Sequence, residues 1–393
     1  MDCYLLTDMA AQIGYELAAA GAETFRIEET MRRVLAAYGI ECEAFAIPNC
    51  VVVSLETDNG KPLMVMKRVG FHGNDLDAVE RLNALSRRIC AETPDPAVAA
   101  QWLEKTRNDR RSYSVPVYYL GNLLAASGFC PVFGGTLRDS LWAGLMGLII
   151  GFVTRRMDKL ETNPFFSTIA AAFGLVDYAD AVIIGSLMIL VPGLLITNSM
   201  RDIIYGDTNS GVNRIVQVLL SALAIAMGTA AAWHITSSLY GQTAASTLSY
   251  PFWLQAIAIA VACTGFVILF NVHGWGRCLC ALGGVVTWMA YLLCGKLGLG
   301  PYGANFIAAA VAAVYAEGMA RARKYPVTSY QVISAVPLLP GAGIYYTMSL
   351  GLNGSTQLAL QRGFATAGIA GSIAAAILLV SSVVRLFTAQ RKK

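Results

Sequence analysis

Charged residues are scarce in this sequence. Asp, Glu, Lys and Arg make up only 14% of its 393 residues, whereas a soluble globular domain carries roughly 25%. Hydrophobic residues make up 56% of the chain, and the mean hydropathy is +0.54. The composition therefore excludes a chain that is soluble throughout and predicts a membrane protein.

Acidic residues are scarcest after residue 112. Residues 1–112 contain 13 Lys or Arg and 17 Asp or Glu, whereas residues 113–393 contain 16 and only 8. We therefore predict a small soluble domain at 1–112, long enough for one modest core, and a polytopic membrane domain after it.

Cysteine pairs and histidines are also few. Nine cysteines are scattered without a CxxC motif, and only three histidines occur, so we expect reduced structural cysteines, no metal site and no cofactor. The N-terminus lacks the basic region of a cleavable signal peptide, so we expect the soluble domain to stay in the cytoplasm. The net charge of +4 does not indicate nucleic-acid binding, because the basic residues gather at the predicted membrane boundaries.

The soluble domain is predicted to be α+β. Its apolar periodicity favours the element order ααβββαα, with Asp95 as the N-cap and Pro96 at the first position of the last helix. The predicted ranges are 5–20, 25–38, 42–48, 50–56, 62–69, 75–91 and 96–112. A polar cluster in the second helix is either a solvated face or a small ligand site; it consists of Glu23, Arg26, Glu28 and Glu29.

Ten later segments approach the ~20 apolar residues that a membrane-spanning helix needs. They are 113–133, 136–154, 163–178, 181–200, 212–235, 251–271, 275–295, 302–320, 328–350 and 357–386. With the soluble domain in the cytoplasm, the cytoplasmic ends of these spans carry 13 Lys or Arg and the outer ends carry 3. This bias follows the positive-inside rule, so we predict that the C-terminus is cytoplasmic as well.

The stretch from Leu187 to Gly211 interrupts one of these spans. Pro192-Gly193 breaks the helix where lipid offers no hydrogen bonds, which is tolerated only if the backbone is buried in protein or lines a wet cavity. A second break, Pro340-Gly341, follows 148 residues later. Paired broken helices in corresponding halves of a membrane protein indicate a transport site.

The membrane domain is predicted to be an internal repeat. Its halves, 113–240 and 248–393, hold five spans each. Because five is odd, the second half must be inverted relative to the first. The expected fold is an all-α polytopic membrane protein of ten transmembrane helices in an inverted five-plus-five repeat, preceded by the small α+β domain.

Polar residues beside the breaks form the candidate binding site. Thr197 and Asn198 can hydrogen-bond a zwitterion or a hydroxylated side chain, and Arg201 could hold a carboxylate in a bidentate fork. A structural pair of Arg201 with Asp202 is the competing interpretation. The predicted substrate site comprises Pro192, Gly193, Thr197, Asn198, Arg201, Pro340 and Gly341.

Three carboxylates are candidates for proton coupling. Asp202 could orient Arg201 or bind a proton. Asp180 lies near the outer end of the fourth span, where it could instead be a solvated loop acid. Asp139 lies just inside the second span and could instead pair with Arg138 at the interface.

Several of these residues give the chain a family resemblance. The segments that carry it are Gly21–Glu28 (GAETFRIE), Phe133–Gly135 (FGG), and Val191–Asn198 (VPGLLITN) with Arg201-Asp202 and Gly206-Asp207. These segments resemble those of the threonine/serine exporters of bacterial inner membranes. The order of the chain, a soluble domain followed by two sets of five spans, resembles that family as well. The resemblance implies efflux of L-threonine and L-serine driven by the proton gradient.

We therefore expect a proton-coupled exporter of small polar amino acids rather than an enzyme. Its expected partners are the amino-acid substrate, protons and membrane lipids, and a homo-oligomer is left open. The nearest rival function is export of dicarboxylates such as succinate, which would need a second cation, Arg138 or Arg362. A passive channel is a second rival, and a membrane-tethered hydrolase that uses residues 1–112 is a third.

Overall fold

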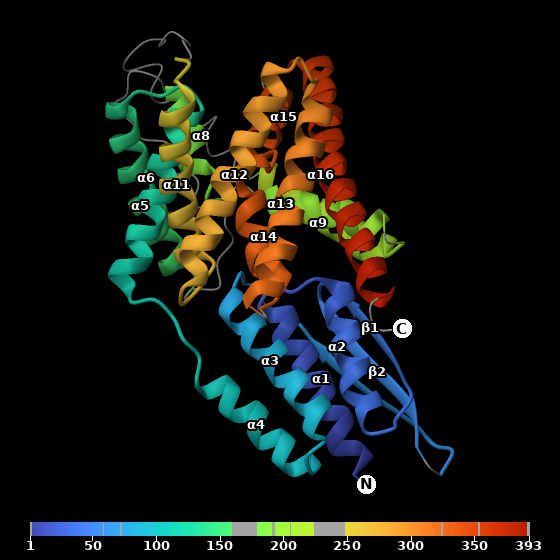
Figure 1. The fold of residues 1–393 in the computed structure, drawn as a ribbon. Coiled ribbons are helices and arrows are strands. Elements are labelled where there is room, and N and C mark those ends of the chain that lie inside the picture. Colours follow the sequence, from blue (N-terminus) through green and yellow to red (C-terminus); the bar gives the residue numbers. More distant parts are fainter. Residues whose placement is uncertain are drawn as a thin grey trace. The chain divides into compact units, whose positions relative to one another are not determined.

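The computed structural model describes most of the chain as helices in two compact units (Figure 1). Unit 1 comprises residues 1–112 with two short segments from later in the chain, 207–213 and 270–273, and unit 2 comprises the rest. The described residues are 2–57, 59–70, 73–158, 179–190, 193–204, 206–223, 248–323, 325–352 and 354–390.

Unit 1 follows the predicted order ααβββαα. The elements are α1 (Cys3–Ala19), α2 (Thr24–Ala37), β1 (Cys42–Ile47), β2 (Cys50–Glu56), β3 (Pro62–Arg68), α3 (Leu76–Glu92) and α4 (Pro96–Asn108). The strands form an antiparallel sheet in the order β1-β2-β3. Alternate strand residues such as Val51 and Val53 are buried on the side of α1 and α2, so the core of the unit lies there.

Local signals set the helix ends of unit 1. The Asp95 side chain accepts a hydrogen bond from the first turn of α4, and Pro96 opens that helix, as predicted. Helix α2 ends just before Gly39, whose φ of +76° suits a residue without a side chain.

Glu28, in the polar cluster of α2, has a structural role. Its Oε1 accepts a hydrogen bond from the Ala46 N–H of β1 at 2.9 Å, and its Oε2 pairs with Arg32 at 3.2 Å. Burial raises the pKa of the Glu28 carboxyl above its ordinary value, although both contacts oppose the shift. The carboxylate therefore ties α2 to the sheet.

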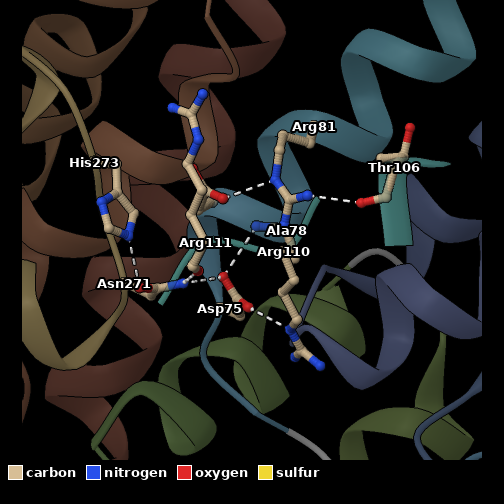
Figure 2. A network of polar contacts seen from close by, with 9 residues as sticks. Asp75, Ala78, Arg81, Thr106, Arg110, Arg111, Asn271 and His273 are labelled. Carbon is tan, nitrogen blue, oxygen red and sulfur yellow. Dashed lines mark hydrogen bonds and ion pairs between the residues drawn. The ribbon is translucent and has the colours of Figure 1, made fainter. Parts of the chain in front are cut away.

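Asp75 is the centre of a polar network that includes the segment 270–273 (Figure 2). Its Oδ1 caps α3 and accepts a hydrogen bond from Asn271 Nδ2 at 2.9 Å, while its Oδ2 pairs with Arg110 Nε at 3.2 Å. Asn271 also donates to the Arg111 carbonyl at 2.7 Å, and its Oδ1 contacts His273 Nε2 at 2.9 Å. The link between α11 (Phe252–Leu269) and α12 (Gly276–Lys296) thus belongs to unit 1.

Unit 2 contains the long apolar helices. Besides α11 and α12, its labelled elements are α5 (Val115–Val132), α6 (Leu137–Asp158), α8 (Ala179–Leu187), α9 (Gly193–Ile204), α13 (Pro301–Arg323), α14 (Val327–Ala335), η1 (Val336–Leu338), α15 (Gly341–Leu352) and α16 (Thr356–Gln390). A further helix extends through residues 214–223.

Six described helices are long and apolar enough to cross a membrane, namely α5, α6, α11, α12, α13 and α16. The helix pair α14–η1 and α15 would make a seventh span, bent by 48°. The protein is therefore a multi-pass membrane protein. These seven coincide with seven of the ten predicted spans; 163–178 lies outside the described residues, and 181–200 and 212–235 are described only in part.

Helices α5 and α11 pack closely and antiparallel, and Figure 1 draws them side by side. Both have 18 residues, and residue n of α5 corresponds to residue n + 137 of α11. A Cβ added at Gly128 would lie 2.7 Å from the Ala258 carbonyl oxygen, and one added at the equivalent Gly265 would lie 2.6 Å from that of Gly121. Gly121 and Ala258 are also equivalent, so the contact is reciprocal, as across a local two-fold axis.

Candidate functional site

The first predicted break separates α8 from α9. Helix α8 ends at Leu187, a turn follows at 188–190, and α9 begins at Gly193. Pro192 lies outside the described residues. The described part of α9 therefore starts at the glycine of the Pro-Gly pair.

Polar residues follow on α9 within two turns of this start. The Thr197 hydroxyl is buried and donates to the Gly193 carbonyl at 3.2 Å, and the Ser199 hydroxyl donates to the Ile196 carbonyl at 3.0 Å. Asn198 is half-buried, and its side chain makes no hydrogen bond to another described residue. Its amide can therefore both donate to and accept from a ligand.

Asp202 forms an ion pair that the sequence analysis missed. Its Oδ2 lies 3.1 Å from Arg214 Nε, and both side chains are nearly nine-tenths buried. Arg201 is half-buried. Since Arg214 lies twelve residues after Asp202, beyond the turn at Gly206, only the folded chain reveals this partner. A buried pair of opposite charges is costly to break on one side.

The second predicted break separates α14–η1 from α15. The short 3-10 helix ends at Leu338, and α15 begins at Gly341, directly after Pro340. Pro340 and Gly341 are both buried. The helix thus restarts at the glycine of a Pro-Gly pair, the position at which the described part of α9 also starts.

The two broken segments correspond in sequence position. Residue n of the first corresponds to residue n + 148 of the second, and α8 and α14 end at the equivalent residues Leu187 and Ala335. The turns after α9 and α15 also correspond, because Gly206 and Gly354 have φ values of +92° and +78°.

The two breaks touch each other. A Cβ added at Gly193 would lie 2.9 Å from Leu339 Cβ and 3.8 Å from the Gly341 backbone nitrogen. Side chains further along α9 and α15 join one apolar cluster, which includes Ile196 and Ile344. The N-termini of two helices therefore converge at one point, and each brings the positive end of a helix dipole.

Asp139 is fully buried at the start of α6 and forms a local cap. Its Oδ2 accepts hydrogen bonds from the Thr136 N–H at 2.9 Å and the Thr136 hydroxyl at 2.8 Å, while its own N–H donates to the Thr136 Oγ1 at 3.1 Å. This is a reciprocal capping box. The other oxygen, Oδ1, has no hydrogen-bond partner among the described residues. Asp180 lies in α8, but its side chain lies outside the described part of the chain.

Two spans of this protein are broken, and they meet at the N-termini of their second halves, α9 and α15. This arrangement defines a class, the multi-pass membrane proteins built on discontinuous helices. Within this class, the family model ThrE, described as "Putative threonine/serine exporter", matches residues 8–236. A second model, described as "Threonine/Serine exporter, ThrE", matches residues 255–383. The chain belongs to the threonine/serine exporter family.

Two named relatives match most of the chain. A "Threonine/serine exporter" of Corynebacterium glutamicum is 23% identical over 402 aligned positions, which cover 96% of this chain and 82% of the relative. A "Probable threonine/serine exporter" of Mycobacterium tuberculosis is 22% identical over 368 positions, which cover 86% and 68%. No solved structure matches the chain.

Proposed function

We propose that the protein is a secondary transporter that exports L-threonine and L-serine across the bacterial inner membrane and uses the proton gradient. The family and the names of both relatives support the cargo. The observation that carries the proposal is the contact between the two breaks at Gly193 and Gly341. Discontinuous helices near the middle of a membrane domain bind the substrates of many secondary transporters.

The architecture proposed is the inverted five-plus-five repeat, with halves at 113–240 and 248–393 after the domain at 1–112. The reciprocal packing of α5 on α11 supports it, because a two-fold axis that relates two antiparallel helices runs across them and so lies in the membrane plane. The equivalent ends of α8 and α14 and the equivalent turns at Gly206 and Gly354 support it too. Both termini would then be cytoplasmic.

The substrate carboxylate would bind where the N-termini of α9 and α15 converge. Backbone N–H groups and helix dipoles favour an anion at such a point. Thr197 and Asn198, one turn into α9, would contact the polar part of the amino acid. Arg201 lies eight residues beyond Gly193, about 12 Å along the helix, so it would receive the carboxylate at another stage of the path.

Proton coupling is assigned first to Asp139. Its buried Oδ1 has no partner among the described residues, so one carboxyl oxygen is not committed to the capping box. Asp202 is paired with Arg214, which fits a gate better than a proton carrier. Asp180 remains a candidate on its sequence position alone.

The rival functions have less support. A dianionic dicarboxylate calls for a second cation, and both Arg138 and Arg362 are exposed. A hydrolase on residues 1–112 has no support from the family, whose members are named exporters. A channel remains testable, because its flux would ignore a proton gradient.

The test is flux in proteoliposomes loaded separately with labelled threonine, serine, succinate and alanine, each with and without a proton gradient. We expect threonine and serine fluxes that rise at least tenfold with the gradient. Arg201→Ala should abolish them and Arg201→Lys should restore only part, because lysine cannot form the bidentate fork. Flux of succinate alone would overturn the cargo, and flux indifferent to the gradient would overturn the coupling.

A further inference from the structure

Helix α14 carries a row of buried polar side chains that the sequence analysis did not single out. Thr328, Gln331 and Ser334 are 3%, 7% and 0% exposed. Each has a side-chain atom that is buried without a hydrogen-bond partner in the described part of the chain: Thr328 Oγ1, Gln331 Nε2 and Ser334 Oγ. Such atoms are rare in folded proteins and need an explanation.

The three residues share one face of the helix. Their spacing of three makes each a neighbour of the next on the helix surface. Helix α14 packs against α12 and α13. Ser334 Oγ occupies the position that a side chain on Gly283 of α12 would need, close to Tyr315 of α13. The missing side chain at residue 283 thus leaves room for the Ser334 hydroxyl itself.

Two buried hydroxyls of neighbouring membrane helices behave differently. Thr287 of α12 and Thr366 of α16 donate to the carbonyls of Gly283 and Arg362, one turn back in their own helices. This local bond is the usual way to satisfy a hydroxyl in a membrane helix. The Ser334 hydroxyl does not make it, although it would relieve the cost of burial.

The row also lies in the broken span itself. Ser334 precedes Pro340 by six residues, and the equivalent residue of the first half is Ser186. At the positions equivalent to Thr328 and Gln331 the first half has Asp180 and Ile183. The first half therefore has an ionisable group where the second has only neutral donors and acceptors.

We propose that Thr328, Gln331 and Ser334 bind the side-chain hydroxyl of the transported amino acid. This inference rests on the proposed function and deepens it. Gln331 Nε2 would donate to the hydroxyl oxygen, and one of the two hydroxyl oxygens on either side of Gln331 in the row, Thr328 Oγ1 or Ser334 Oγ, would accept its single proton. The row has no charge, so it suits the neutral end of the substrate, while the converging helix N-termini suit the carboxylate. It makes the site selective for serine and threonine over alanine.

The experiment compares the wild type with Ser334→Ala, Gln331→Leu and Thr328→Val, and with Thr287→Val as a control whose hydroxyl is satisfied within its helix. Inhibition of labelled threonine flux by L-serine and L-alanine gives the preference for the hydroxyl. We expect Ser334→Ala and Gln331→Leu to reduce this preference about tenfold and the control to preserve it. The Tm of the substrate-free protein should rise in these two variants, because they remove buried polar atoms that have no partner.

The outcomes separate the two proposals. If the wild type transports threonine and the variants keep its preference for serine over alanine, the row does not bind the hydroxyl. If all three variants have a lower Tm than the control, the row is structural and the inference is wrong. If the wild type moves neither threonine nor serine, the proposed function itself fails, and the inference fails with it.

Discussion

At the scale of single residues, Asp139 combines two environments in one carboxyl group. One oxygen is used by the capping box with Thr136, while the other is buried without a partner among the described residues. The first environment is structural, and the second leaves one carboxyl oxygen uncommitted. Substitution can separate these roles because Thr136 supplies only the first.

We predict that Asp139→Asn uncouples flux from the proton gradient. Gradient-driven efflux should fall at least tenfold, while exchange of substrate between the two sides persists, since the amide cannot bind a proton at physiological pH. Thr136→Val is the matched control: it should cost about 1 kcal/mol of stability as a lost cap but keep the pH dependence of flux. Equal pH profiles for wild type and Asp139→Asn would leave Asp139 with capping alone.

Some of these residue-level features could be read from the sequence and others could not. The Pro-Gly breaks were visible because proline and glycine act on the backbone at their own positions. The ion pair between Asp202 and Arg214 was not, since a turn and a change of helix separate the two residues. The row on α14 was missed because Thr328, Gln331 and Ser334 are single polar residues in an apolar segment, and only their missing partners make them unusual.

At the scale of elements, the closest helix pair depends on glycine. Helices α5 and α11 approach so closely that no side chain fits at Gly128 or Gly265. Phe129 and its equivalent Phe266 make an edge-to-face contact beside them, with ring centroids 5.8 Å apart. Small residues at such a crossing let helix backbones approach within van der Waals distance in a membrane.

We predict that Gly128→Ala and Gly265→Ala each destabilise the protein by about 1–3 kcal/mol through overpacking, and by similar amounts because the two sites are equivalent. Gly318→Ala in α13 and Gly371→Ala in α16 are the controls, since an added Cβ would meet nothing within 4 Å there. They should be neutral or stabilising. Thermal unfolding in one detergent measures all four. A loss at only one of the two crossing glycines would contradict the local symmetry.

At the scale of the whole molecule, the number of spans decides on which side the chain ends. The seven spans that the described residues support would put the termini on opposite sides, whereas the ten predicted from the sequence put both in the cytoplasm. The apolar runs and the bias of basic residues carried the prediction of ten. They say nothing of how the spans pack, which the reciprocal contact of α5 with α11 revealed.

We predict that green fluorescent protein fused after Lys393 fluoresces, because it folds only in the cytoplasm. The same reporter fused after residue 245, in the predicted outer loop, should be dark. Alkaline phosphatase at the same two points should give the opposite pattern and serves as the control. With the N-terminal domain in the cytoplasm, a dark C-terminal fusion and an active phosphatase at the same point would require an odd number of spans. That result would exclude the inverted five-plus-five repeat.

The contact between the two breaks has a mechanical meaning as well. The described parts of helices α9 and α15, 12 residues or about 18 Å each, both extend from the contact between Gly193 and the segment at Leu339 and Gly341. A rotation of about 10° of either helix about this contact moves its far end by about 3 Å, roughly the width of a water molecule. Because both helices start at this contact, one small rotation about it would open the site at the far end of one helix and close it at the far end of the other.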